Sequence, residues 1–204
     1  MREKNSQLEN VVGELKRCDA DYPVLLNNVS DAPDPLYFIG QHNKVIFNNT
    51  LAVVGSRAVT LYGEWVVDNI VKEVARYGVT IVSGFMYGVD ALSHQAALDV
   101  GGFTIAVMAG GIRKIFPRYQ EQLYCDITEN GLIVSEYIEG AEGKWMFARR
   151  NRIVAGLSHA VLVVEAAESS GSLITRNRPV ISKAATDMIT HIQLPRMPFP
   201  KLTE

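Results

Sequence analysis

From residue 51 onward, short apolar runs alternate with glycine-containing turns and with segments of helical periodicity. The apolar runs are nearly continuous and rich in valine and isoleucine, as expected of strands that are covered on both faces. They are LAVVGSR (51–57), VTIVSGFMYGVD (79–90), FTIAVMAGG (103–111), LIVSEY (132–137) and AVLVVEA (160–166). This alternation predicts an α/β fold, specifically a Rossmann-like, doubly wound, mostly parallel sheet with helices on both faces.

The segments between the apolar runs predict the helices. The first is expected from about Thr60 to Tyr77, with Gly78 ending it. Its periodicity puts four large side chains near one face, namely Trp65, Ile70, Val74 and Tyr77. Later helices are expected up to Leu98, from near Pro117, and through ARRNRIVAGLS (148–158).

The two ends of the chain have a different pattern. Ser6 to Arg17 has the spacing of an amphipathic helix, and prolines and aspartates then interrupt short apolar pieces over residues 21–40. We therefore expect residues 1–50 to form a cap packed on the edge of a main domain at 51–204. Within that domain, residues 176–204 are proline-rich and atypical, and no regular structure is expected there.

Composition narrows the class of protein. A length of 204 residues suits one domain of ordinary size, and a formal charge of −2 means that any site for a polyanion has to be local. Cys18 and Cys125 are far apart, which argues against a disulfide scaffold, a zinc site or a redox dithiol. The apolar runs are strand-sized and the N-terminus lacks the apolar core of a signal peptide, so a cytoplasmic protein without membrane spans is expected.

The loops that follow the predicted strands share small and hydroxylated residues. In an open parallel sheet such loops meet at one edge, where backbone N–H groups at helix N-termini can bind phosphate. Each glycine taken alone would simply indicate a tight turn, but together they predict an anion-binding crevice. Its loops are Gly55-Ser56-Arg57, Ser83-Gly84 continuing to Gly88, Gly110-Gly111, Ser135-Glu136 and Ser169 to Ser172. Neither GxGxxG nor GxxxxGK[ST] occurs, which argues against dinucleotide and Walker-type nucleotide binding.

Cationic and aromatic residues lie close to these loops in the sequence. Arg57, Lys114 and the segment Arg149-Arg150-Asn151-Arg152 are candidates for phosphate binding, with Arg113, Arg118 and Lys144 nearby. Phe116 and Phe147 are candidates for stacking on bases, and Tyr119 and Trp145 are further ones. The alternatives are structural salt bridges, a solvated charged face and core aromatics.

Asp90, His94 and Glu165 are the best candidates for acid–base chemistry. His94 lies in a predicted helix, which favours a hydrogen-bonded core or interface residue, and Asp90 is also consistent with a helix N-cap. No catalytic triad, carboxylate pair or metal-ligand spacing emerges, so we expect no catalytic residues, no metal, no cofactor and no enzymatic activity.

Read together, these motifs resemble the bacterial DNA-processing protein A family, also called DprA or Smf. The resemblance extends from about Asp21 to Thr175. The motifs that carry it are Tyr22-Pro23, Leu36-Tyr37 with Gly40, VVGSR (53–57), Tyr62-Gly63, IVSGFMYGVDALSHQAAL (81–98), TIAVMAGGIRKIFP (104–117), LIVSEY (132–137), FARRNRIVAGLS (147–158) and VLVVEAAESSGSLIT (161–175).

The resemblance implies a protein that binds single-stranded DNA, protects incoming strands during natural transformation (competence) and loads the RecA recombinase. It implies single-stranded DNA, RecA and a second copy of the chain as partners. It also assigns the DNA pocket to Gly55-Ser56-Arg57, the Ser83-Gly84 loop, the Gly110-Gly111 loop with Lys114, and the segment 149–152. The chain departs from the family pattern at Gln120 and Ala148, which lie beside the pocket. It departs further after Thr175, in the later part of the domain that relatives use for dimerisation and RecA contacts.

A second hypothesis is a nucleotide-binding or phosphoribohydrolase-like enzyme on a related fold. Such enzymes carry a PGGxGTxxE-type motif, whereas this chain has Ser170-Gly171-Ser172-Leu173 without the companion glutamate. Release of a free base from nucleoside monophosphates would support this hypothesis.

Overall fold

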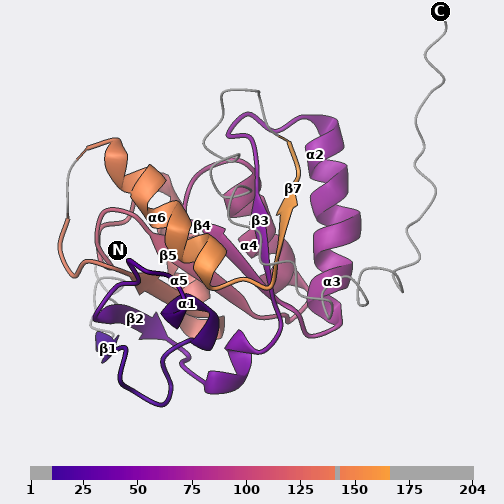
Figure 1. Ribbon diagram of the computed structural model, residues 1–204. Coiled ribbons are helices and arrows are strands. Elements are labelled where there is room, and N and C mark those ends of the chain that lie inside the picture. The colour runs from indigo at the N-terminus through magenta and orange to yellow at the C-terminus, as the bar shows by residue number, and fades with distance from the viewer. Residues whose placement is uncertain (1–10, 141–142, 166–204) are drawn as a thin grey trace, which may run out of the picture.

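The structure is a computed structural model that describes residues 11–140 and 143–165 (Figure 1). Its centre is a seven-stranded sheet with the spatial order β1-β2-β6-β5-β4-β3-β7. The strands are β1 (Gly13–Leu15), β2 (Leu36–Gly40), β3 (Thr50–Val54), β4 (Thr80–Gly84), β5 (Thr104–Met108), β6 (Leu132–Ser135) and β7 (Ala160–Val163). Strands β3 to β7 run parallel, whereas β1 and β2 pair antiparallel at one edge.

Helices fill the connections between the strands. The α-helices are α1 (Val24–Asn27), α2 (Leu61–Val66), α3 (Lys72–Arg76), α4 (Val89–Asp99), α5 (Glu121–Asn130) and α6 (Trp145–Gly156). Two short 3₁₀ helices, η1 (Lys44–Phe47) and η3 (Arg118–Gln120), lie before β3 and α5. A π-helical segment, η2 (Val67–Val71), joins α2 to α3 in one continuous helical run that Thr60 caps.

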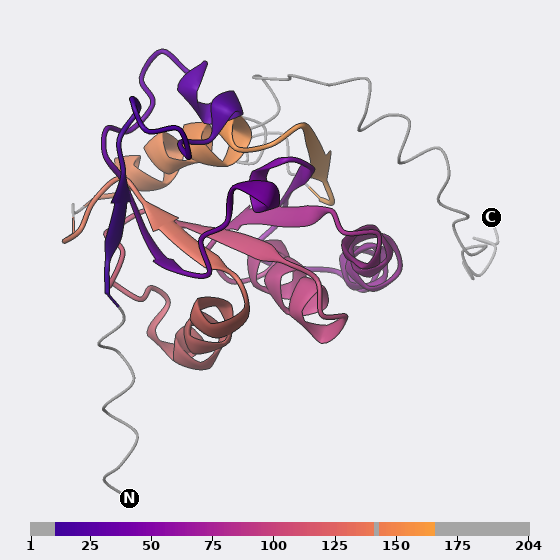
Figure 2. The same ribbon diagram turned by 90° about the horizontal axis from the view of Figure 1, so that it is seen from below.

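The order in which successive strands are added to the sheet reverses at β3. Strands β4, β5 and β6 follow β3 in one direction, and β7 is added on its other side. Because parallel crossovers are right-handed, reversing the direction moves the connecting helix to the opposite face. Accordingly, α6 lies on one face, while α2, α3, α4 and α5 lie on the other (Figure 2). The predicted Rossmann-like fold with helices on both faces is confirmed.

Alternating side chains of the central strands supply the two apolar layers. Val82, Ile105 and Val107 face the layer that contains α1 and α6. Ile81 belongs to the layer under α3 and α4, and Ala106 packs in the layer that holds α5. All five side chains are fully buried, which explains why the strands appear as continuous apolar runs in the sequence.

The predicted helix from Ser6 to Arg17 is wrong where the structure describes it. Gly13–Leu15 forms strand β1, which pairs with residues Leu36 to Phe38 of β2. Gly13 is a poor helix former, and the absence of a side chain lets the ring of Phe38 lie directly against its backbone. Strand pairing in the folded protein thus overrides the helical spacing. Strands β1 and β2 extend the sheet at its edge, and β3 begins at the predicted division near residue 50.

Tyr77 does not share the buried side of the helix with the other three side chains that were expected near one face, because it is 68% exposed. Val71 and Val74 are buried instead, with Trp65 and Ile70 partly buried beside them. The π-helical segment Val67–Val71 has a wider turn, so every side chain after it is rotated relative to a regular α-helix.

Several predictions concern residues outside the described part of the chain. They are the first half of the helix at Ser6 to Arg17, the loop Ser169 to Ser172 and the atypical segment 176–204. Among residues 11–140 and 143–165, no helix combines the length and the apolar composition that crossing a membrane requires.

Candidate functional site

The carboxyl ends of β3, β4 and β5 form a crevice in which two glycine loops pack against each other. The carbonyl oxygen of Ser56 accepts a hydrogen bond from the N–H of Val89, 3.1 Å away, which ties the loop after β3 to the first turn of α4. Ser56 Oγ is 2.7 Å from the carbonyl oxygen of Ala58 and 3.1 Å from its N–H, so the serine closes its own turn. At Gly55, a Cβ atom would be only 2.6 Å from Val89 Cγ2.

Gly88 is the residue on which the packing of these two loops depends. Its φ of 87° lies in the region that side chains disfavour, and a Cβ atom there would be 2.6 Å from Arg57 Cα. We expect Gly88→Ala to destabilise the protein by at least about 2 kcal/mol, because strain and a backbone clash coincide.

Gly78 provides the matched control for this prediction. Its φ is 78°, but a Cβ atom would have nothing within 4 Å, so Gly78→Ala introduces backbone strain without a clash. Urea denaturation of the two variants should show a clearly larger loss of stability for Gly88→Ala. Equal losses of stability in the two variants would mean that the packing between the two loops does not contribute to the stability of the protein.

Arg57 carries an exposed guanidinium at the opening of the crevice. Its Cζ atom is 5.7 Å from the ring centroid of Tyr87 and 5.8 Å from that of Phe147, which are cation–π distances. The Phe147 ring is in turn 6.0 Å from Phe116, with an angle of 49° between the planes. The structure therefore brings the predicted Arg57, Phe116 and Phe147 together. It adds Tyr87, which sequence reasoning missed although it lies in the glycine-containing loop after β4.

Arg150 lies beneath the crevice. Its side chain is 7% exposed, and Nη1 donates a hydrogen bond of 2.9 Å to the carbonyl oxygen of Val107. Gly84 leaves room for it, since any Cβ atom at that position would overlap the guanidinium. Arg150 thus connects α6 to the ends of β4 and β5.

The counter-ion of Arg150 is Asp90 in the first turn of α4. Its carboxylate Oδ2 is 4.0 Å from Nη2 of Arg150, and its side chain is 14% exposed. Burial raises the pKa of Asp90 and the charge of Arg150 opposes that rise, while burial lowers the pKa of Arg150. Ser83 is fully buried and its hydroxyl is 2.6 Å from the carbonyl oxygen of Val53. A hydrogen bond with the Ser83 side chain also opposes the rise in the pKa of Asp90.

Arg149 and Arg152 share one carboxylate, that of Glu136. Arg149 is half-exposed and forms two hydrogen bonds with Glu136, of 3.1 Å and 2.9 Å. Arg152 is buried, with Nη2 2.6 Å from Glu136 and Nε 2.9 Å from Asp31. Burial raises the pKa of Glu136, but the hydrogen bond from Arg149 and the charges of both arginines outweigh it and hold that pKa below its usual value. The residues of the predicted segment 149–152 therefore differ in their exposure to solvent. Arg149 is the one arginine of this segment that is exposed, Arg150 and Arg152 are buried, and Asn151 is half-buried.

The loop after β5 forms the third wall of the crevice. Gly111 has a φ of 124°, and a Cβ atom there would be 2.9 Å from the carbonyl carbon of Glu139. This close approach, with a hydrogen bond of 2.9 Å from the N–H of Ile112 to the carbonyl oxygen of Tyr137, joins the loops after β5 and β6. Gly110 and the exposed Lys114 line a cavity of about 330 Å³ between this loop and the start of α6.

The candidates for acid–base chemistry are spread over the fold. Glu165 hydrogen-bonds the hydroxyl and the N–H of Thr60, and so supports the start of α2. Asp90 is paired with Arg150, and Gly88, not Asp90, is the N-cap of α4. In the part of the chain that the structure describes, no group of three or more histidine, cysteine, aspartate or glutamate side chains could hold a metal ion.

His94 is a fully buried residue of α4. Its Nε2 is 2.8 Å from the carbonyl oxygen of Gly84 and its Nδ1 is 2.7 Å from Thr104 Oγ1. A carbonyl oxygen only accepts, so Nε2 carries the proton of the neutral ring. Nδ1 and the carbonyl oxygen of Ile81, which is 2.9 Å from Thr104 Oγ1, are then alternative acceptors for the single proton of the threonine hydroxyl. Burial lowers the pKa of His94 to about 4.

Because His94 takes up a proton more readily in the unfolded chain, it contributes a loss of stability as the pH falls from about 6.5 towards 4. Above the unfolded pKa the ring is neutral in both states, so His94 causes no loss of stability there. We expect His94→Gln to show a flatter dependence of stability on pH in this range, measured by urea denaturation. Parallel curves for the two proteins would show that His94 does not titrate as described.

Comparison with protein families and with known proteins shows which proteins this chain resembles. The family model described as "DNA recombination-mediator protein A" matches residues 14–183. The chain is 41% identical to the DNA processing protein DprA of Bacillus subtilis, over 82% of the chain and 57% of the relative, and 43% identical to the protein Smf of Escherichia coli, over 76% and 41%. It thus spans about half the length of the curated relatives that it matches.

Solved structures give the same result. DNA processing protein A of Streptococcus pneumoniae superimposes with a TM-score of 0.75 and 33% identity, over 90% of this chain and 69% of that one. A Helicobacter pylori structure, described by its single-stranded DNA binding mode, superimposes with a TM-score of 0.74 and 28% identity, over 83% and 76%. The sequence motifs, the order of the strands and both comparisons agree that this chain belongs to the DNA recombination-mediator protein A (DprA/Smf) family.

Proposed function

We propose that the chain binds single-stranded DNA in the crevice at the carboxyl ends of β3, β4 and β5. The observation that carries this proposal is the exposed Arg57 guanidinium, which lies between Tyr87 and Phe147. Arginine pairs with phosphate oxygens, and aromatic rings stack on unpaired bases, so this arrangement suits a strand whose bases are accessible. The related H. pylori protein, described by its single-stranded DNA binding mode, supports the same ligand.

The site residues that we propose have unequal roles. Arg57, Lys114 and Arg149 bind phosphates from solvent-accessible positions, together with the backbone N–H groups of the loops at Gly55-Ser56 and Gly110-Gly111. Ser83, Gly84, Arg150, Asn151 and Arg152 support these loops from beneath or beside them. Phe116 and Phe147 stack on bases.

We further propose a role without catalysis, in the cytoplasm, during natural transformation. The chain would protect incoming strands and load the RecA recombinase, acting as a dimer. The family's description as a recombination mediator supports this role. Strand exchange by RecA on pre-coated single strands, with and without this protein, tests the loading step, and sedimentation at several concentrations tests the dimer.

Competition between nucleic acids tests the choice of ligand. A labelled oligothymidine bound to the protein should be displaced by unlabelled single strands at concentrations at least about tenfold below those needed with a duplex of the same length. The reason is that a duplex hides the base faces that the aromatic residues contact. Equal displacement by duplex and single strand would contradict the proposal.

A further inference from the structure

We propose that Gln120 is a positioning residue for DNA binding, whose buried carboxamide holds the loop after β4 so that Tyr87 stays beside the Arg57 guanidinium. The inference rests on the proposed function and adds a residue that acts through Tyr87, without binding DNA itself. Gln120 is the N-cap residue of α5, and its side chain is 6% exposed. Its Nε2 donates a hydrogen bond of 3.3 Å to the carbonyl oxygen of Met86, the residue before Tyr87.

Met86 is held through both of its main-chain polar groups. Its carbonyl oxygen accepts from Gln120, and its N–H donates to the carboxylate of Asp90. This second hydrogen bond opposes the effect of burial, which raises the pKa of Asp90. Asp90 is in turn the counter-ion of Arg150. The chain cannot turn at Met86 without breaking one of these bonds, so the direction in which it continues to Tyr87 is fixed.

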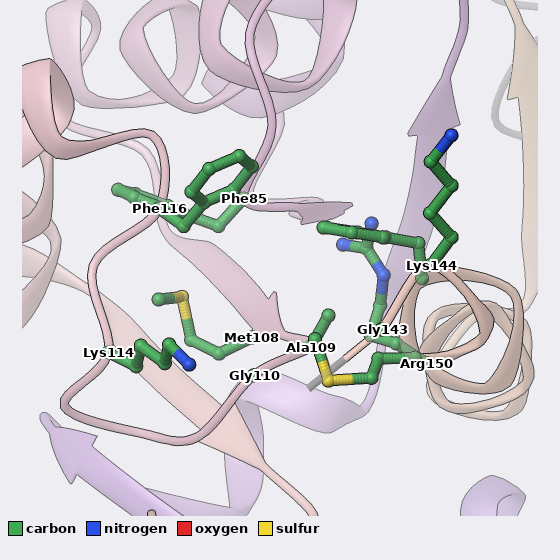
Figure 3. A pocket seen from close by; sticks show the side chains of 11 residues that line it. Phe85, Met108, Ala109, Gly110, Lys114, Phe116, Gly143, Lys144 and Arg150 are labelled. Atoms are coloured by element: carbon green, nitrogen blue, oxygen red, sulfur yellow. The ribbon is translucent and has the colours of Figure 1, made fainter. Parts of the chain in front are cut away.

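The first turn of α5 is itself anchored to the loop after β5. Tyr124 is 2% exposed, and its hydroxyl donates a hydrogen bond of 2.9 Å to the carbonyl oxygen of Ile112. Its ring meets that of Phe85 edge to face, with the centroids 6.2 Å apart. Phe85, from the loop after β4, and Phe116, from the loop after β5, both line the cavity of the crevice (Figure 3). The start of α5 therefore gives Gln120 a fixed position from which it reaches the loop after β4.

Tyr87 connects this loop to the proposed DNA site. Its ring is 39% exposed, and the Cζ atom of Arg57 is 5.7 Å from the ring centroid. A cation–π contact that exists before DNA arrives keeps the guanidinium at the opening of the crevice. Less conformational freedom then has to be lost on binding. Loosening the loop should therefore weaken DNA binding although no charge is removed.

Stability alone does not explain a carboxamide at this position. Within the described residues, Oε1 of Gln120 is buried and has no hydrogen-bond partner. The carbonyl oxygen of Met86 can only accept, so the NH₂ group has to face it and the amide cannot be turned to pair Oε1. A buried acceptor without a donor costs free energy, which an apolar side chain of similar volume avoids. What the carboxamide adds over such a side chain is its bond to Met86.

Gln120→Met tests the inference, because it keeps the approximate size of the side chain and removes the donor. Binding is measured by fluorescence anisotropy with a labelled oligothymidine. The affinity should fall about two- to fivefold, the equivalent of one exposed cation–π contact. The slope of log affinity against log salt should stay unchanged, because no cation is lost. Gln122→Met is the control, since Gln122 lies on the same helix but is exposed and bonds Asp126, and it should leave the affinity unchanged.

A double-mutant cycle with Tyr87→Ala separates positioning from general support of the fold. If Gln120 acts through Tyr87, adding Gln120→Met to Tyr87→Ala should cause no further loss of affinity. Losses that simply add would contradict the inference, because Gln120 would then act independently of Tyr87.

Gln120→Glu provides a test within one protein, and it applies even if thermal melting shows that Gln120→Met is unfolded. The neutral acid can donate to the Met86 carbonyl, whereas the carboxylate cannot. Burial raises the pKa of a carboxyl group, so the neutral form is favoured at acidic pH. The affinity of this variant should match that of the wild type near about pH 5.5 and fall below it near about pH 8. Wild-type affinity at both pH values would overturn the inference.

The outcomes separate this inference from the proposed function. If the wild-type protein does not bind oligothymidine, the proposed function itself is wrong. If the wild type binds and folded Gln120→Met binds equally well, the phosphate crevice stands and Gln120 is not a positioning residue. If Gln120→Met lowers the affinity only while Tyr87 is present, Gln120 positions Tyr87.

Discussion

Asp90→Ala is expected to lower the free energy of unfolding by about 3–5 kcal/mol, because it leaves the buried guanidinium of Arg150 without its counter-ion. For a chain of this size, such a loss lowers the melting temperature by roughly 10 °C. Calorimetry and urea denaturation at neutral pH measure both quantities. The effect should extend to DNA binding, since Asp90 and Arg150 together hold the loop after β4 against β5 and α6.

The control for this prediction is Asp68→Ala. Asp68 also lies in a helix and pairs with a lysine, Lys72, at 2.8 Å, but its side chain is 62% exposed. Exposed ion pairs contribute little, so its loss should hardly change the melting temperature. The double variant Asp90→Ala, Arg150→Met removes both buried charges and should be more stable than Asp90→Ala alone. Equal melting temperatures for Asp90→Ala and Asp68→Ala would show that the buried pair of Asp90 and Arg150 is not needed for the stability of the protein.

Replacing Arg57 and Lys114 together with glutamine is expected to weaken binding of single-stranded DNA by at least about a hundredfold. Each charged contact with phosphate contributes about 1.5–3 kcal/mol, and both cations are exposed at the crevice. Fluorescence anisotropy with a labelled oligothymidine measures the dissociation constants. The two changes should also reduce the slope of log affinity against log salt by about 0.7 for each phosphate contact that is lost.

Arg76→Gln is the control for the charge itself. Arg76 ends α3 just before β4 begins, so it lies near the amino ends of the parallel strands, whereas the crevice lies at their carboxyl ends. It carries the same charge and should have little effect on affinity or on the salt slope. A loss as large as that of the double variant would mean that DNA binding responds to net charge and not to the crevice.

The sequence predicts the sheet well, and with it the meeting of the loops that follow β3, β4 and β5, because both depend on local patterns. Continuous apolar strands such as Thr104–Met108 require cover on both faces, and parallel strands place their following loops at one edge. The strand at Gly13–Leu15 could not be predicted in this way, because its extended conformation is stabilised by pairing with β2, which is distant in the sequence. The extra width of the π-helical turn likewise leaves no mark in the hydrophobic spacing.

The arginine cluster was the least predictable part of the site. Successive residues on a helix point about 100° apart, so Arg150 points away from the face that Arg149 and Arg152 share. Where each one points depends on Glu136 and on partners distant in the sequence, Asp90 for Arg150 and Asp31 for Arg152. Charge spacing alone identifies the cluster but does not separate the exposed cation from the buried ones.

The salt dependence of single-stranded DNA binding by the wild-type protein tests the central claim most directly. Three phosphate contacts, from Arg57, Lys114 and Arg149, predict a slope of log affinity against log salt of about −2 or steeper. The measurement is an anisotropy titration with oligothymidine at four or more salt concentrations. A slope of about −2 would support phosphate binding in the crevice, and an affinity independent of salt would contradict it.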